Sequence, residues 1–137
     1  MATAPQQSTV ARWHALVEGR NLAGLDDVIA DGAVFHSPVV HTPQEGKAIT
    51  IFYLTAAFHV LLDQGFRYVR EVVGPRDAVL EFVAEIDGIH VNGVDMIHWN
   101  ADGKIDDFKV MVRPMKAINL LFRLMGEKLQ QLKSAQG

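Results

Sequence analysis

The chain has 137 residues, of which 49% are hydrophobic and 21% charged, with a net charge of −3 and no cysteine. This length and composition fit one globular domain spanning residues 1–137, and the acidic balance excludes a general attraction to nucleic acid. Without cysteine, disulfides, thiolate metal sites and cysteine nucleophiles are also excluded.

The first residues, 1–7, are small and polar, and we expect them to be flexible. They lack the basic start and the apolar core of a signal peptide. No apolar run reaches membrane-spanning length, so we expect a cytoplasmic protein that does not bind membranes.

The first half of the sequence predicts helices around one short strand. Ser8 is expected to cap a first helix, whose apolar positions lie on one face. A second, short helix closes at Asp31–Gly32, and residues 33–37 form a strand that Pro38 ends. A loop follows to Gly46, and a longer helix runs from Lys47 to about residue 62.

The second half alternates with the period of strands. Strands are predicted at 66–73, 77–87, 89–100 and 105–113, with tight-turn signals at 87–88 and 101–103. Pro114 opens a final helix over 114–133. Because helices and strands are segregated along the chain, the fold class is α+β.

Alternation along the strands predicts which side chains face the core. The apolar sets are expected to face inward: Leu80, Phe82, Ala84 and Ile86; Val91, Gly93, Asp95, Ile97 and Trp99; and Phe108, Val110 and Val112. The second set places one carboxylate, Asp95, on a mainly apolar surface.

Asp95 is therefore the first candidate for chemistry. Burial in apolar surroundings raises the pKa of a carboxyl group and favours its neutral form, which can donate a hydrogen bond to an oxyanion. The ionised form can act as a base. The alternative is a structural Asp that bonds a hydroxyl, an indole or a backbone amide.

Two further catalytic candidates end the first strand. His36 is the better acid or base, and Ser37 shares a face with Phe35, which favours Ser37 as the inward residue. Adjacent strand residues point to opposite faces, so we expect only one of them to reach the pocket. A surface position is the more common role for such a histidine.

Aromatic and aliphatic side chains would surround the ligand. Trp13, Tyr53, Tyr68 and Trp99 can each supply an indole or phenol hydrogen bond, although ordinary core packing is the more common role for any one of them. The residues expected to bind a small apolar ligand are Trp13, Phe35, Tyr53, Phe82, Trp99, Phe108 and Val110. The scattered histidines have no metal-ligand spacing, so neither a metal nor a cofactor is expected.

The outward face of the sheet is too apolar for a solvated surface, since it mixes Val83, Met96 and Met111 with charges. This mixture predicts a homodimer packed through that face. The terminal helix carries a heptad-like apolar stripe, expected to pack on the core, at Met115, Ile118, Phe122, Met125, Leu129 and Leu132, which Leu121 and Leu124 widen.

Several short runs, taken in order, resemble proteins of the nuclear transport factor 2-like superfamily, in its SnoaL-like, polyketide cyclase-type and ketosteroid isomerase-type branches. They are Ala33-Val34-Phe35-His36-Ser37-Pro38, Glu45-Gly46-Lys47-Ala48-Ile49 and Trp99-Asn100-Ala101-Asp102-Gly103-Lys104-Ile105. The resemblance implies a cone-shaped, cystatin-like roll: a curved antiparallel sheet wrapped around N-terminal helices. The C-terminal helix is an addition to the isomerase pattern.

The comparison with the isomerases can be made residue by residue. Their acidic oxyanion-hole donor stands four residues before the aromatic residue that precedes the last hairpin, and Asp95 before Trp99 matches it. Their phenolic donor lies in the first helix, where this chain has Trp13. Their general base directly precedes the proline that ends the first strand, where this chain has Ser37, and serine is no base.

The leading hypothesis is a SnoaL-like domain that binds a small, largely apolar molecule in a conical pocket. The resemblance implies isomerase, cyclase or hydrolase chemistry, with Asp95 moving a proton or stabilising an oxyanion. The alternative is a non-catalytic ligand-binding or dimerisation module, which the missing base favours.

Overall fold

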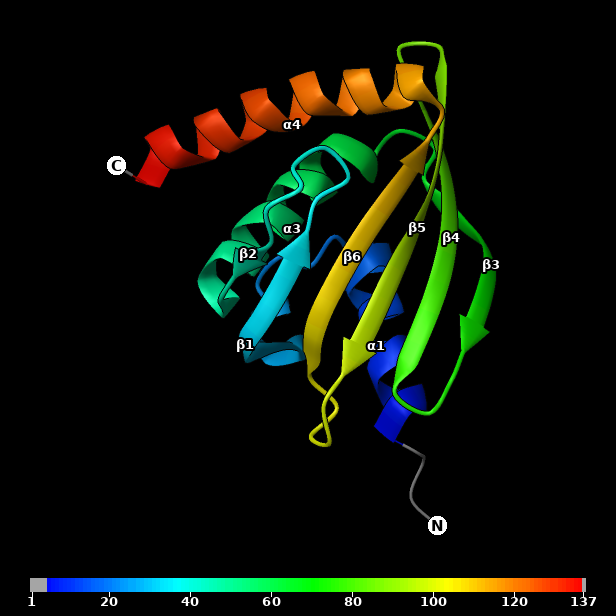
Figure 1. Ribbon diagram of the computed structural model, residues 1–137, viewed down its shortest axis with the longest axis vertical. Coiled ribbons are helices and arrows are strands. Elements are labelled where there is room, and N and C mark those ends of the chain that lie inside the picture. Colours follow the sequence, from blue (N-terminus) through cyan, green and yellow to red (C-terminus); the bar gives the residue numbers. More distant parts are fainter. Residues whose placement is uncertain (1–4, 137) are drawn as a thin grey trace.

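The computed structural model describes residues 5–136 and has an α+β fold (Figure 1), as the sequence predicts. The first four residues of the segment expected to be flexible lie outside the described range, and residues 5–7 belong to the first helix. In chain order the elements are α1 (Pro5–Gly19), α2 (Leu25–Val28), β1 (Ile29–His36), β2 (Gln44–Glu45), α3 (Lys47–Leu61), β3 (Arg67–Val73), β4 (Asp77–Ile86), β5 (Ile89–Trp99), β6 (Ile105–Arg113) and α4 (Met115–Gln136).

Within the described range the strands form one six-stranded sheet in the order β2-β1-β6-β5-β4-β3. Every neighbouring pair is antiparallel except β1 and β6, which run parallel. Helix α3 carries the chain to the far edge of the sheet, and three antiparallel connections bring β6 back beside β1. The sheet is thus antiparallel, as the resemblance implies, except at the pair of β1 and β6.

Three boundaries in the first half differ from the sequence expectations. Helix α1 begins at Pro5, so Ser8 lies inside the helix and does not cap it. Strand β1 begins at Ile29, which pairs with Ile105, and the register shifts before Val34. The exposed Asp31–Gly32 pair therefore lies in an irregular part of the strand, where the sequence suggests the end of a helix. The short strand β2 lies within the expected loop.

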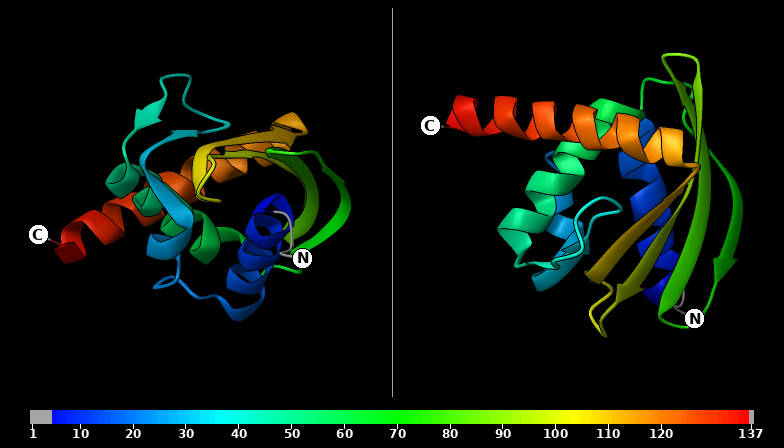
Figure 2. Two further views of the ribbon diagram at one scale, coloured as in Figure 1. Left: turned by 90° about the horizontal axis from the view of Figure 1, so that it is seen from below. Right: turned by 45° about the horizontal axis from the view of Figure 1, so that its top comes forward.

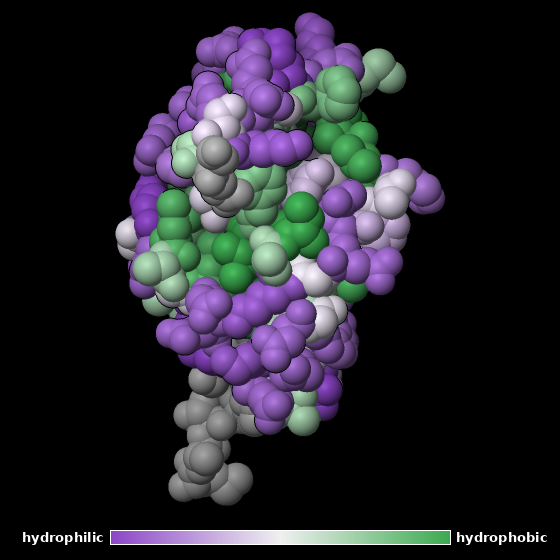
Figure 3. Space-filling view, turned by 90° about the vertical axis from the view of Figure 1, so that its left-hand side faces the viewer, coloured by the Kyte–Doolittle hydropathy of each residue, from purple (hydrophilic) through white to green (hydrophobic). Residues whose placement is uncertain are grey.

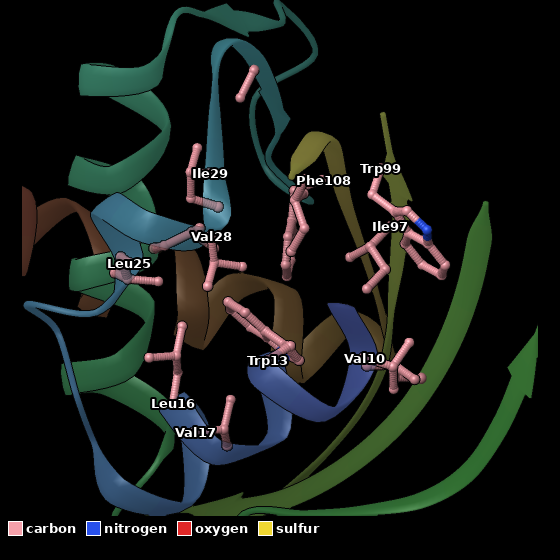
Figure 4. Close-up of a cluster of buried hydrophobic side chains, with 14 of the residues drawn as sticks. Val10, Trp13, Leu16, Val17, Leu25, Val28, Ile29, Ile97, Trp99 and Phe108 are labelled. Atoms are coloured by element: carbon pink, nitrogen blue, oxygen red, sulfur yellow. The ribbon is translucent and has the colours of Figure 1, made fainter. Parts of the chain in front are cut away.

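The predicted inward faces of β4 and β5 are confirmed, because buried and partly exposed residues alternate along both strands. The sheet curls around α1, while α3 lies beside it and α4 crosses one end (Figure 2). Trp13 and Phe108 meet in the core with their ring centroids 5.0 Å apart, among aliphatic side chains from α1, α2 and β1 (Figure 4).

Helix α4 packs through a stripe that matches the predicted one only in part, because its core contacts include Leu121 but not Met115 or Phe122. Ala117, Leu120 and Leu121 are buried, whereas Met115 and Phe122 are 75% and 62% exposed. None of residues 122–135 is buried, because the second half of α4 projects beyond the sheet (Figure 1). Hydrophobic side chains gather on the flank below that projecting end (Figure 3).

Residues 5–136 form four helices, α1 to α4. Not one of them combines the length and the apolar character that a membrane crossing requires.

Candidate functional site

A cavity lies between the inner face of the sheet and the helices that cover it. The space among its lining atoms is about 660 Å³, a figure that includes open solvent at the mouth. The lining side chains are Trp13, Val17, Phe35, Ser37, Pro38, Val39, Leu54, Ala57, Phe58, Leu61, Leu62, Phe66, Tyr68, Phe82, Asp95, Phe108, Val110, Val112, Leu121 and Met125. The wall is therefore almost entirely apolar.

Most of the residues predicted for the site share this wall. They are Trp13 from α1, Phe35 from β1, Ser37 from the following loop, Phe82, Asp95, Phe108 and Val110. These residues come from distant parts of the chain, and strand alternation turns their side chains to one side of the curved sheet.

Asp95 is the single charged side chain among the residues that line the cavity in the described part of the chain. It lies in the middle of β5, opposite Leu80 of β4 and Val110 of β6. Its place on the inner face follows from the alternation with the buried Gly93 and Ile97, and only 6% of the residue is exposed.

A chain of hydrogen bonds ends at this carboxylate. The indole Nε1 of Trp13 donates to the hydroxyl oxygen of Tyr68 over 3.0 Å, and that hydroxyl donates to Oδ2 of Asp95 over 2.6 Å. An indole is only a donor, so it fixes the direction of the chain. Tyr68 uses its one proton on Asp95, and both donors therefore stabilise the ionised carboxylate.

The surroundings shift the acidity of both groups. Burial raises the pKa of Asp95 to about 7, and the hydrogen bond from Tyr68 opposes part of that rise. The pKa of Tyr68 lies well above its usual 10, mainly because of burial and then because of the nearby Asp95 charge. At neutral pH Tyr68 is thus a neutral donor, while Asp95 is present in both its neutral and ionised forms.

Two polar groups remain available to a ligand. Oδ1 of Asp95 has no hydrogen-bond partner among the described residues. The hydroxyl oxygen of Ser37 accepts a bond from the Val39 amide over 3.1 Å, which leaves the hydroxyl proton free to be donated. The cavity thus offers one atom that can accept a proton and one group that can donate a hydrogen bond.

Of the two candidates at the end of β1, Ser37 reaches the cavity and His36 does not. His36 lies on the opposite face of the sheet, where its Nε2 is 2.9 Å from Oδ1 of Asp107. The proline after Ser37 ends the strand with Ser37 on the side of Phe35, as strand alternation suggests. The assignment of His36 to the catalytic pocket is therefore wrong on position.

Two predicted ligand contacts also lie elsewhere. Tyr53 stacks on the far side of Phe35, with ring centroids 5.2 Å apart, and does not line the cavity. Trp99 is fully buried in the core, and its Nε1 has no partner among the described residues. Both share an apolar face with cavity residues, but they lie in parts of the core that the cavity does not reach.

Tyr68 is the site residue that the predicted set omits. The residue type and the strand pattern indicated this role, since a phenol in an alternating strand can place its hydroxyl on the inner face of the sheet. The sequence could not show that β3 and β5, which are not neighbours in the sheet, bring this hydroxyl to Asp95. In β3 Tyr68 is only partly buried, and the six residues around it in the strand are exposed.

Within the described range no three His, Asp or Glu side chains come together as metal ligands. The donor set of the cavity, one carboxylate and one hydroxyl, also falls short of the three protein ligands that a catalytic zinc site uses.

The sequence profile of the SnoaL-like domain matches residues 10–108. No curated protein matches the chain at the level required for a relationship. Among solved structures, a steroid delta-isomerase from Pseudomonas aeruginosa is similar over 96% of each chain, with 36% sequence identity and a TM-score of 0.91.

Two further structures share the fold. A protein with a cystatin-like fold from Silicibacter pomeroyi is 28% identical, with a TM-score of 0.81, covering 88% of this chain and 84% of its own. The epoxide hydrolase/cyclase-like enzyme SalBIII, of pyran ring formation in salinomycin, is 19% identical, with a TM-score of 0.65 over 82% of this chain and 92% of its own. The last likeness concerns the fold alone.

Proposed function

The chain belongs to the SnoaL-like family, with the nuclear transport factor 2-like fold, and on this premise we propose that it is an acid–base enzyme. Its substrate is a small, largely apolar carbonyl compound. Its reaction removes a proton from a carbon atom beside the carbonyl group and returns it to carbon. The observation that carries the proposal is the free Oδ1 of Asp95, a buried carboxylate oxygen on an apolar cavity wall.

In the proposed reaction the ionised Asp95 acts as the base. Oδ1 takes a proton from the carbon beside the carbonyl group, and the electrons of the broken C–H bond move toward the carbonyl oxygen. The Ser37 hydroxyl donates a hydrogen bond to that oxygen, and Asp95 then returns the proton to carbon. The proton and electron pair are conserved, so the step needs no further reactant.

The isomerase resemblance implies a base at the position of Ser37 and an oxyanion donor at the position of Asp95. In the proposed reaction Asp95 is the base and Ser37 is the donor. Serine cannot serve as a base, whereas an Asp with a pKa of about 7 is half ionised near neutral pH. Tyr68 and Trp13 are positioning residues, since their hydrogen bonds hold Asp95 in place and favour its ionised form.

The decisive experiment follows deuterium exchange at carbon. Small apolar ketones and enones are incubated in D₂O with the protein, and loss of the α-proton signal is followed by NMR. We expect the wild type to accelerate exchange and Asp95→Asn to lower the rate at least about a hundredfold. Asp102→Asn, an exposed change of the same kind in a turn, serves as the matched control.

Binding without catalysis is the contrary outcome. If the ketones raise the melting temperature of the wild type but no exchange occurs, the cavity binds without catalysis, and the enzyme proposal fails. Equal exchange rates in wild type and Asp95→Asn would also contradict it. Circular dichroism of the variant establishes that it is folded.

A separate proposal concerns assembly: two copies associate through the outward face of the sheet. Met111 on that face is 49% exposed, and Val72 of the edge strand β3, which pairs with the outward Val79, is 65% exposed. Such a surface is costly to leave in water. We expect sedimentation of a dimer, and of a monomer for Met111→Glu. A wild-type monomer at micromolar concentration would rule out this interface.

A further inference from the structure

A surface groove continues from the mouth of the cavity. It runs between the loop after β1 and the second half of β6, and four residues, Ser37, Pro38, Val110 and Val112, line both the cavity and the groove. The cavity and the groove therefore adjoin one another at these four residues.

The groove exists because β1 is shorter than its neighbour. The last parallel pair joins His36 to Lys109, and β6 continues to Arg113 without a partner on that side. In the described part of the chain, no backbone hydrogen bond joins residues 110–113 to the loop of residues 37–43. The strand edge thus adds unpaired backbone donors and acceptors to the groove wall.

The ionisable side chains of the groove are one lysine and two histidines. His36, His41 and Lys109 line it, and none of the lining residues is acidic. Nε2 of His36 lies 2.9 Å from Oδ1 of Asp107, so this histidine already has a partner. Lys109 and His41 have no ion-pair partner among the described residues, so their donors are free for a ligand.

We infer that the groove is a subsite for a carboxylate, and that the ligand of this protein is an amphipathic organic acid. Its apolar body fills the cone toward Asp95, and its carboxylate emerges past Ser37 to bind Lys109 and His41. This inference rests on the proposed function for the place of the apolar body, and it adds the charge and the direction of the substrate.

The test uses pairs of molecules that differ only in charge: phenylalkanoic acids of increasing length and their methyl esters. Binding to the full chain is measured by calorimetry at low ionic strength. We expect an acid of suitable length to bind more tightly than its ester. Lys109→Met should weaken the acid about three- to tenfold and leave the ester unchanged.

Lys133→Met is the matched control, because Lys133 is an exposed lysine of α4 outside the groove. Added salt should weaken the acid and not the ester. If Lys109→Met does not fold, Lys109→Gln replaces it.

The outcomes separate this inference from the proposed function. Esters that bind as well as acids, in wild type and in Lys109→Met alike, would overturn the carboxylate subsite and leave the cavity proposal standing. If acids bind more tightly than esters by the same factor in wild type and in Lys109→Met, the carboxylate subsite is overturned as well. If neither acids nor esters bind, the carboxylate subsite is overturned, and the exchange experiment with ketones decides the proposed function separately.

Discussion

The hydroxyl group of Tyr68 reaches Oδ2 of Asp95 over 2.6 Å, although their strands, β3 and β5, are separated by β4. The curvature of the sheet makes this contact possible, because it turns the inner faces of the two strands toward one another (Figure 2). The result is a buried acid held by a neutral donor, and most of the expectations below depend on this pair.

The stability of the protein should depend on pH through Asp95. In the unfolded chain its pKa is near 3.8, and in the native state it is about 7. Between these values the unfolded chain releases a proton that the native state keeps, so rising pH favours unfolding. Stability from this group is complete below pH 4 and is lost as pH rises to 7, by at most roughly 4 kcal/mol.

Asp95→Asn isolates this contribution, because other groups titrate in both proteins. We expect similar free energies of unfolding near pH 4 and a more stable variant at pH 8, measured by urea denaturation at each pH. A difference between variant and wild type that stays constant from pH 4 to 8 would contradict the raised pKa. Asp102→Asn should follow the wild type throughout.

Tyr68→Phe should raise the pKa of Asp95 above about 7. The hydrogen bond from the phenol stabilises the carboxylate and lowers this pKa, so its loss leaves burial unopposed. Carboxyl ¹³C NMR titration measures the change, with Tyr53→Phe as the control outside the cavity. A pKa that stays the same or falls in Tyr68→Phe would mean that the hydrogen bond is absent in solution.

The placement of Asp95 could be predicted from sequence, whereas its partner could not. Alternation alone puts Asp95 among Val91, Gly93 and Ile97 on the inner face, since a strand has a fixed period. The contact with Tyr68 depends on the order and curvature of the strands. Local patterns contain neither, and for the same reason they did not reveal the parallel pairing of β1 with β6.

Gly93→Ala should destabilise the fold by about 1–3 kcal/mol. A Cβ atom at this position would lie 2.5 Å from the Phe82 ring and 2.8 Å from the backbone oxygen of Met111, so the sheet or the ring must move. Gly126→Ala is the matched control, since open space surrounds this α4 position. It should stabilise the protein by about 0.5–1 kcal/mol, because alanine favours helix.

Thermal and urea unfolding distinguish the two glycine variants. Equal effects at both positions would contradict the close approach of β5, Phe82 and β6.

The orientation of α4 leads to opposite expectations for neighbouring residues. Leu121→Ala should cost about 2–4 kcal/mol, because Leu121 is buried against the core and lines the cavity. Phe122→Ala should change the free energy of unfolding by less than about 0.5 kcal/mol, because Phe122 is mostly exposed. A large loss for Phe122→Ala with a small one for Leu121→Ala would mean that the helix is rotated.

The apolar stripe of α4 misled the sequence interpretation for a physical reason. The steps from Met115 to Leu132 have helical spacing, but so does the neighbouring stripe through Ala117 and Leu121. Spacing alone cannot decide which stripe is buried when most residues from Met115 to Met125 are apolar. The position of Pro114 and the end of β6 decide it in the structure.

The central claim is that Asp95 is a buried acid titrating near neutrality on the wall of an apolar cavity. Carboxyl ¹³C NMR of the labelled protein, with the Asp95 signal assigned by its loss in Asp95→Asn, measures this directly. We expect that signal to titrate with a pKa of about 7. A pKa near 4 would show a solvated carboxylate and contradict the account.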